Sequence, residues 1–480
     1  MNTNPARGMR DFLPSDVRKR NYVIGVIKEV YEKYGFEPLE TPSVENLETL
    51  TGKYGDEGNQ LMFKILKRGE KLQNELEAGN IKSENELSDL ALRYDLTVPL
   101  ARVVANYKND LPKFFKRYQI QPVWRADRPA RGRYREFYQC DVDAIGSSSM
   151  VVEAELCSAV SEILERLGFD DFVILLNHRE ILYGMLEVSG ISEKKQTDAL
   201  VALDKFDKIG EEGVIKELVE GEVATEENAR ELLGQFLSLM KLHIMPASDV
   251  PREKTFDSEM NERNRANDAI LEKLSIALGN SELGKAGINT VREILNFAAN
   301  TKSQGRIRFQ PNLARGLSYY TGAIFEIGLN RLDFTGSIAG GGRYDGLIGM
   351  FGKEQIPAVG FSLGLERILL IMEERGMFPA DLQTNSADVM VTIWKEETAS
   401  ESLKLAAELR AEGLRVLVYP EADKLGKQFK YADSVNIPYV CILGETELAE
   451  RKVALKNMKT GEQAQVMRNA ICAKIIELNV

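Results

Sequence analysis

Apolar residues recur every three to four positions over residues 16–34 and 150–167, and this spacing predicts amphipathic helices. The first stretch ends at Gly35, which is a typical helix stop. Residues 90–107 have the pattern of a short strand followed by a helix, and 170–178 form an apolar run of strand length. This mixture of elements predicts a core in which helices cover a sheet.

The pattern changes between residues 179 and 302, where charged residues accompany helical periodicity and alternating strand patterns are missing. We expect an inserted helical domain there. A shorter charged stretch, residues 66–88, predicts a solvated helical excursion or loop. Strand character returns at 306–328, and a helix-forming segment at 360–376 closes this part of the chain.

Strands and helices alternate again from residue 387 onward. The segments DVMVTIW, LRVLVYP and PYVCILG have strand lengths, and a charged hairpin and a last helix follow them. This order predicts a small α/β domain with a largely parallel sheet. We therefore expect a core built from residues 1–178 and 303–378, a helical insertion at 179–302 and a terminal domain at 387–480.

Composition narrows the classes of protein that fit these elements. The chain has 480 residues, 44% of them hydrophobic, which is enough for several folded domains. Its four cysteines lack a CxxC spacing and its first residues lack an apolar signal region, so we expect a cytoplasmic protein. No apolar run reaches the roughly 18 residues that suggest a membrane span. With only two histidines, a histidine-rich metal site or a histidine-activated nucleophile is poorly supported.

One segment is strongly basic, although the whole chain has a net charge of −11. Residues 113–135 contain eight lysines or arginines and one aspartate. They predict a strand that carries Arg125, an arginine-rich loop, and a second strand that begins at Phe137. Guanidinium groups bind phosphate oxygens in pairs and an aromatic face stacks on a purine. The hairpin therefore predicts a local triphosphate site rather than general affinity for nucleic acids such as DNA.

Three later segments carry related chemistry. Arg315 stands in LARGLSYYTG, three consecutive glycines at 340–342 stand in AGGGRYDG, and Arg367 follows a glycine-rich strand in GFSLGLER. Glycine lets a backbone pass close to a ligand, although a tight strand turn explains these glycines equally well. Many arginines and few histidines favour a reaction that needs positioning and charge neutralisation more than acid or base catalysis.

The basic hairpin and the GLER turn resemble motifs 2 and 3 of the class II aminoacyl-tRNA synthetases. ARGLSYYTG and AGGGRYDG resemble the signature peptides of the histidyl-tRNA synthetases. The resemblance implies an α+β catalytic core with an antiparallel sheet flanked by helices, a helical insertion and a C-terminal α/β anticodon-binding domain. It implies ATP-dependent ligation of L-histidine to tRNA(His) through a histidyl-adenylate, with release of AMP and diphosphate. A weaker match of residues 35–50 to motif 1 implies a homodimer.

The resemblance also assigns the ATP site. The residues expected to contact ATP are Arg125, Asp127, Arg133, Phe137 and Arg367. Arg125 and Arg315 would flank the α-phosphate and the attacking carboxylate, and with Arg367 they form the expected catalytic set. Magnesium would bridge the phosphates with few protein carboxylates, so we expect no separate metal site.

The histidine site is assigned in the same way. The expected contacts are Asp95, Thr97, Arg125, Gln139, Asp143, Arg315, Tyr319, Tyr320 and Tyr344. Asp143 and Tyr320 would read the ring nitrogens of the substrate. Gln139 and Asp143 lie four positions apart on one predicted strand, so their side chains point to the same face. Hydrogen bonds to both ring nitrogens would reject apolar analogues, so no editing domain is required.

Some features leave alternatives open. Ser318 stands where the family peptide has aspartate, and strand alternation would turn it away from Tyr319. Lys424, Lys427 and Lys430 either contact tRNA phosphates or form a solvated helix face. The alternative functions are a histidine-binding regulatory relative that does not charge tRNA, a class II synthetase for another amino acid, and an RNA-binding module without catalysis.

Overall fold

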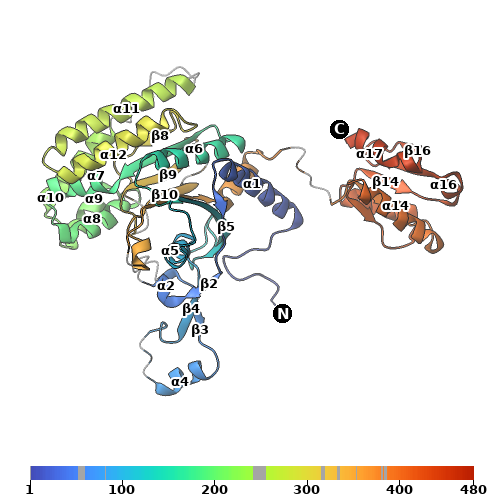
Figure 1. Cartoon of the computed structure of the whole chain (residues 1–480), viewed down its shortest axis with the longest axis horizontal. Helices are drawn as coiled ribbons and strands as arrows, with labels where there is room; N and C mark the ends of the chain where they lie inside the picture. Colours follow the sequence, from blue (N-terminus) through green and yellow to red (C-terminus); the bar gives the residue numbers. More distant parts are fainter. Residues whose placement is uncertain are drawn as a thin grey trace. The chain divides into compact units, whose positions relative to one another are not determined.

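The computed structural model describes residues 2–51, 60–79, 81, 83–241, 256–314, 319–331, 334, 336–352, 354–379, 382 and 386–479. The chain forms two compact units (Figure 1). The first contains Met1–Phe12 and Lys19–Phe378, and the second contains Leu13–Arg18 and Pro379–Val480.

An eight-stranded sheet organises the first unit. Its strands are, in spatial order, β1 (Glu37–Pro38), β5 (Phe115–Trp124), β6 (Glu136–Ile145), β11 (Ala358–Gly364), β10 (Ala339–Arg343), β9 (Ala323–Leu329), β7 (Phe172–His178) and β8 (Ile307–Phe309). The two outermost pairs are parallel and every pair between them is antiparallel. The predicted class, an α+β core with a mostly antiparallel sheet, is confirmed.

Helices cover one face of this sheet. The helices α1 (Pro14–Lys33), α6 (Val151–Arg166) and α12 (Glu282–Ala298) contribute to its main hydrophobic core. The Tyr31 ring lies 5.9 Å from the Tyr118 ring, and its hydroxyl donates to the Cys140 carbonyl oxygen at 3.3 Å. Since side chains alternate along a strand, the residues on either side of Cys140 face the opposite side of the sheet.

The opposite side is lined by a second hydrophobic cluster around α5 (Thr97–Asn106), which includes Tyr319 and Tyr344. Next to it, β2 (Val44–Asn46), β4 (Ser88–Leu92) and β3 (Lys64–Leu66) form a small antiparallel sheet, with α2 (Leu47–Leu50) after β2. Helix α4 (Glu70–Ala78) extends from this sheet and has no buried residue (Figure 1). The predicted solvated excursion thus contains one short exposed helix.

Only helices stand between β7 and β8 in the described part of the chain. They are α7 (Arg179–Val188), η1 (Glu193–Lys195), α8 (Gln196–Asp204), α9 (Phe206–Glu220), α10 (Glu226–Met240), α11 (Phe256–Ala277) and α12. Helices α7 and α12 cross closely: a Cβ added to Gly184 would lie only 2.7 Å from the Gly284 Cα. Glycine at both positions permits this approach.

The second unit is a five-stranded sheet in the order β13 (Val416–Val418), β12 (Val389–Val391), β14 (Tyr439–Ile442), β15 (Lys452–Asn457) and β16 (Gln463–Met467). Its helices are α14 (Ala399–Ala411), α15 (Leu425–Ser434), α16 (Glu445–Glu450) and α17 (Ile471–Asn479). The first three strands are parallel, and β15 and β16 add an antiparallel hairpin. The sheet is therefore mixed rather than largely parallel, because the charged hairpin extends it.

Candidate functional site

Three neighbouring strands present polar or glycine positions to the face of the large sheet that α1 does not cover. Cross-strand pairing places Arg117, Asp143 and Gly360 in one row, Gln119, Asp141 and Ser362 in the next, and Gln121, Gln139 and Gly364 in the third. We call these nine residues the polar face. Directly paired residues point to the same side of a sheet, so the sequence concentrates its polar groups at one place.

Asp143 is held at one end of the polar face. Its side chain is almost completely buried, Arg117 Nη2 lies 2.9 Å from its Oδ2, and the Tyr344 hydroxyl donates to its Oδ1 at 2.5 Å. Burial raises the pKa of Asp143, while the Arg117 charge and the Tyr344 hydroxyl lower it. Asp143 is thus fixed by two partners in a position where it can accept a hydrogen bond from a ligand.

Gly360 makes this placement of Asp143 possible. A Cβ at residue 360 would lie 2.0 Å from Asp143 Oδ1. We expect Gly360→Ala to displace the carboxylate, since overpacking forces side chains off their rotamers. The KM for the amino acid that the family resemblance implies as substrate should then rise by at least about 10-fold. Steady-state kinetics checks this, with Gly234→Ala on α10 as a comparison, because a Cβ there would meet nothing within 4 Å and the backbone is helical. A normal KM for the amino acid in Gly360→Ala would contradict this role of Gly360.

Asp95 lies at the turn before α5 and holds one wall of the site. Its Oδ1 accepts a hydrogen bond from the Val98 N–H at 3.0 Å, and its Oδ2 accepts one from the Tyr319 hydroxyl at 3.1 Å. The Tyr319 ring packs edge-on against Tyr320 and Tyr344, at centroid distances of 5.2 and 6.0 Å. The structure therefore brings together Asp95 and the three predicted tyrosines, and Thr97 is the first residue of α5.

Gln139 and Tyr320 are placed by smaller neighbours. Gln139 Nε2 donates to the Ser362 hydroxyl at 3.1 Å, whereas its Oε1 has no hydrogen-bond partner among the described residues. A Cβ on Gly342 would come within 2.9 Å of the Tyr320 ring, so glycine in AGGGRYDG makes room for this tyrosine. Tyr319 and Tyr320 precede β9 rather than lie in it, and the predicted strand alternation does not apply to them.

The arginine hairpin lies at the other end of β5 and β6. Arg125 follows the last residue of β5, and its Nε donates to the Tyr94 carbonyl oxygen at 3.0 Å. Its guanidinium lies 4.3 Å from the centre of the Tyr94 ring and 5.2 Å from that of Phe137. These contacts hold the guanidinium plane in one orientation.

The next acidic and basic residues of the hairpin bind each other. Arg133 donates two hydrogen bonds to the Asp127 carboxylate, at 3.1 and 2.7 Å. Arg367, on α13 (Leu365–Glu374), donates to the Ser337 carbonyl oxygen, and its Cγ would lie 3.3 Å from a Cβ on Gly132 in the hairpin loop. The structure thus brings Arg367 to the hairpin that carries Arg133.

Arg315 and Ser318 lie outside the described residues. The segment directly before Arg315 is held by buried hydrogen bonds: Asn177 Nδ2 donates to the carbonyl oxygens of Pro311 and Leu313, at 2.8 and 3.0 Å. Arg179 Nη1 donates to the Ala314 carbonyl oxygen at 3.2 Å. These contacts anchor the chain where it enters the first signature peptide.

Sequence reasoning missed Arg117 and Asp141. Both are buried, at 0% and 2% exposure, and both belong to the polar face. In the sequence prediction, Arg117 counts only as one of the eight basic residues of segment 113–135. Alternation along the two strands could have found both residues, because Arg117 and Gln119, like Gln139, Asp141 and Asp143, recur at every second position.

No group of acidic, histidine or cysteine side chains suited to a metal ion occurs among the described residues. Near the hairpin, the Asp127 carboxylate is bound by Arg133, and the Glu366 carboxylate accepts the Tyr138 N–H at 3.0 and 3.1 Å. Burial raises the pKa of Glu366 to about 7. These two carboxylates therefore fit a magnesium ion poorly as direct ligands.

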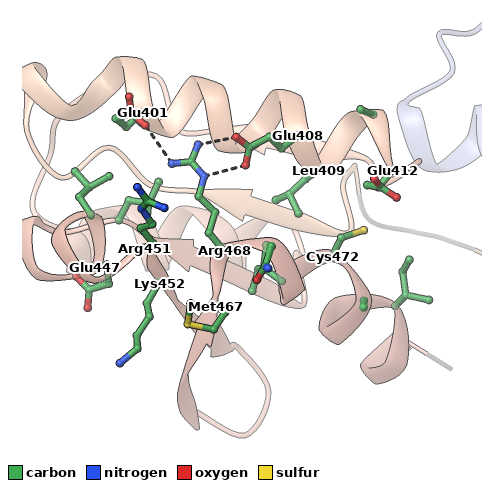
Figure 2. A pocket seen from close by; sticks show the side chains of 17 residues that line it. Glu401, Glu408, Leu409, Glu412, Glu447, Arg451, Lys452, Met467, Arg468 and Cys472 are labelled. Atoms are coloured by element: carbon green, nitrogen blue, oxygen red, sulfur yellow. Dashed lines mark hydrogen bonds and ion pairs between the residues drawn. The ribbon is translucent and has the colours of Figure 1, made fainter.

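The second unit has a groove of about 1230 Å³ between α14, the β15–β16 hairpin and α17 (Figure 2). Figure 2 shows Arg468 between two carboxylates, with hydrogen bonds of 2.9 Å to Glu408 and 3.1 Å to Glu401. A guanidinium that two carboxylates already neutralise is a poor phosphate ligand. The groove is therefore less suited to phosphate than the arginine hairpin.

The predicted phosphate contacts of the second unit lie elsewhere, at the start of α15. Lys424, Lys427 and Lys430 are exposed, and Lys427 lies 2.6 Å from the Asp423 carboxylate. Both interpretations of these lysines stay open. In the described part of the whole chain, no helix is long and apolar enough to cross a membrane.

Comparison with known proteins agrees with this geometry. A family model described as histidyl-tRNA synthetase matches residues 8–368, and one described as anticodon binding domain matches residues 388–478. The histidine–tRNA ligase of Porphyromonas gingivalis is 44% identical over 470 residues, and that of Christiangramia forsetii is 42% identical over 471 residues; each match covers 97% of both chains.

A solved structure is also similar. The crystal structure of histidyl-tRNA synthetase from a Nostoc species superposes with a TM-score of 0.75 and 31% sequence identity, and the match covers 100% of both chains. The predicted family is confirmed: this chain belongs to the histidyl-tRNA synthetases, which are class II aminoacyl-tRNA synthetases, and carries their anticodon-binding domain.

Proposed function

We propose that the polar face binds L-histidine and that the arginine hairpin, with Arg367, binds ATP beside it. The chain has histidine–tRNA ligase activity, as its family membership indicates. The observation that carries our assignment is the Asp143 carboxylate, fixed by Arg117 and Tyr344 on the same strand pair that ends in Arg125. One hairpin thus joins both substrate positions.

In the proposed first reaction, a carboxylate oxygen of histidine attacks the α-phosphorus of ATP and pyrophosphate leaves. Arg125 is proposed to stabilise the charge on the α-phosphate, and the family resemblance assigns the other side of the α-phosphate to Arg315. In-line displacement at phosphorus requires positioning and charge neutralisation, which arginines supply. In the second reaction, a terminal ribose hydroxyl of tRNA(His) attacks the activated carbonyl and AMP leaves.

We assign the ammonium of histidine to Asp95, Thr97 and Gln139, and its ring nitrogens to Asp143 and Tyr320. Phe137 is proposed to stack on adenine, with Arg367 on its other side. Magnesium, which neutralises phosphate charge when bound with ATP, would be held mainly by the phosphates, because Asp127 and Glu366 are already engaged. A homodimer and a cytoplasmic location stay predictions.

The alternative function, a histidine-binding regulatory relative that does not charge tRNA, loses its main support. Residues 388–478 match the anticodon-binding domain, and the arginines of the ATP site are present in the sequence. A chain that only sensed histidine would have no use for both features.

Arg133→Ala tests the ATP assignment. We expect the KM for ATP to rise about 10-fold, because the variant loses a guanidinium for the outer phosphates, while the KM for histidine changes less than twofold. Arg166→Ala is the matched control, since Arg166 lies on α6 and pairs with Glu29. Pyrophosphate exchange at varied ATP concentrations measures both constants. An unchanged KM for ATP in Arg133→Ala would remove Arg133 from the site.

A further inference from the structure

Asp141 occupies the centre of the polar face and has no role in the assignment above. Its side chain is about 2% exposed and stands between Gln139 and Asp143 on β6. Its cross-strand neighbours are Gln119 and Ser362. Every residue next to it on this face is polar, so Asp141 faces the same space as the residues proposed to bind histidine.

Asp141 lacks a complete set of partners among the described residues. Its Oδ1 has no hydrogen-bond partner there, although the atom is buried. The Arg117 guanidinium lies 4.0 Å from Asp141 Oδ2, but 2.9 Å from Asp143 Oδ2, and so belongs mainly to Asp143. A buried carboxylate oxygen without a donor is destabilising, and a donor from a ligand would relieve this.

The charges around Asp141 are also unbalanced. Asp95, Asp141 and Asp143 lie in one buried region that contains Arg117. Other titratable groups that act on this region are Arg93, Arg179, Cys140, Tyr31, Tyr320 and Tyr344. Arg93 makes its hydrogen bonds to Pro122, Thr41 and Gln121. Among the described residues, three buried carboxylates therefore share mainly one guanidinium, that of Arg117, which binds Asp143. The α-ammonium group of an amino acid is a cation of suitable size to balance the remaining charge.

We propose that Asp141 is a further residue of the amino-acid site, whose free Oδ1 accepts a hydrogen bond from the α-ammonium group of L-histidine. This inference rests on the proposed placement of histidine on the polar face. Asp141 also supplies the charge that makes the site select a cationic amino group rather than a neutral one.

A proton is coupled to this binding. Burial raises the pKa of Asp141 to about 7; Arg117 opposes this, Asp143 and Asp95 add to it, and Ser362 lowers it. A bound ammonium group stabilises the carboxylate and lowers its pKa again, so histidine binding near pH 7 releases part of a proton from Asp141. Release on binding means that affinity for histidine increases as the pH rises through about 7.

The test is isothermal titration calorimetry of the full-length protein with L-histidine at pH 7, in phosphate and in Tris buffer. For Asp141→Asn we expect histidine affinity to fall by about 10- to 100-fold, the loss of one charge-assisted hydrogen bond, with ATP affinity changed less than twofold. The difference in binding heat between the two buffers, which reports proton release, should also shrink. Asp170→Asn, whose exposed carboxylate pairs with Arg331, should behave as wild type.

Two results would overturn the proposal: histidine affinity within threefold of wild type in Asp141→Asn, or equal losses for histidine and ATP. If Asp141→Asn does not fold, Asp141→Ser takes its place, because it removes the charge with a smaller side chain. Histidine affinity should again fall at least about 10-fold with ATP affinity changed less than twofold, and histidine affinity within threefold of wild type would contradict the role of Asp141. Histidine-dependent pyrophosphate exchange by the wild type tests the proposed function separately. If the wild type shows this exchange and Asp141→Asn binds histidine with normal affinity, only the role of Asp141 is rejected.

Discussion

Replacing Arg125 with alanine is expected to lower the rate of histidyl-adenylate formation by about 10³-fold, the effect of removing a preorganised donor from a developing charge. Arg125 stands directly after β5, between the two proposed substrate positions. Its hydrogen bond to Tyr94 and its stacking between Tyr94 and Phe137 fix the guanidinium before ATP binds. Single-turnover formation of the adenylate measures the loss.

Arg125→Lys is the matched variant. Lysine keeps the charge but lacks the planar fork that binds two phosphate oxygens, so we expect it to recover only part of the rate. Both variants should keep a thermal unfolding midpoint close to that of the wild type, because Arg125 is only partly buried. A folded Arg125→Ala variant with a rate within tenfold of wild type would show that another group stabilises the α-phosphate.

Replacing Asp143 with asparagine is expected to lower kcat/KM for histidine by about 100-fold or more. The variant loses the charge that a ring N–H of histidine would meet, and it places an amide beside Arg117 and Tyr344, whose donors now satisfy Asp143. Asparagine is also a weaker, uncharged partner for Arg117, and this adds to the loss because a buried guanidinium needs a carboxylate. Pyrophosphate exchange at varied histidine concentrations measures kcat/KM for histidine.

The outcome separates a substrate contact from a structural one. If Asp143 binds the imidazole ring, the KM for ATP stays within about twofold of wild type while kcat/KM for histidine falls. Asp198→Asn, at an exposed position of α8, is the control for a charge change outside the site. Equal losses for ATP and histidine would mean that Asp143 mainly supports the sheet.

Much of the fold followed from local patterns. Residues 114–139 predicted an antiparallel hairpin, and β5 and β6 form it over ten paired residues. The GFSLGLER segment predicted a strand that turns into a helix, and β11 runs directly into α13. Such elements can be predicted because period, turn residues and length are local properties of the chain.

The order of strands in the sheet could not be predicted in this way. Asp141 joins the polar face beside Ser362 because β11 lies beside β6, although more than 200 residues separate the two in the sequence. The same pairing explains why residue 360 must be glycine. Local periodicity shows that Arg117 and Asp141 share a face with their neighbours, but only the packed sheet shows that this face is buried and polar. The expected strand through residues 319 and 320 was wrong for a related reason, because both tyrosines pack on tertiary neighbours before β9 begins.

The central claim is that the polar face selects histidine beside an ATP site. The most direct test is exchange of labelled pyrophosphate into ATP, measured with the full-length protein, without tRNA and with each of the twenty amino acids separately. The account predicts exchange with histidine and none above background with the other nineteen. Exchange with a different amino acid, or no exchange with histidine in a folded sample that binds ATP, would contradict it.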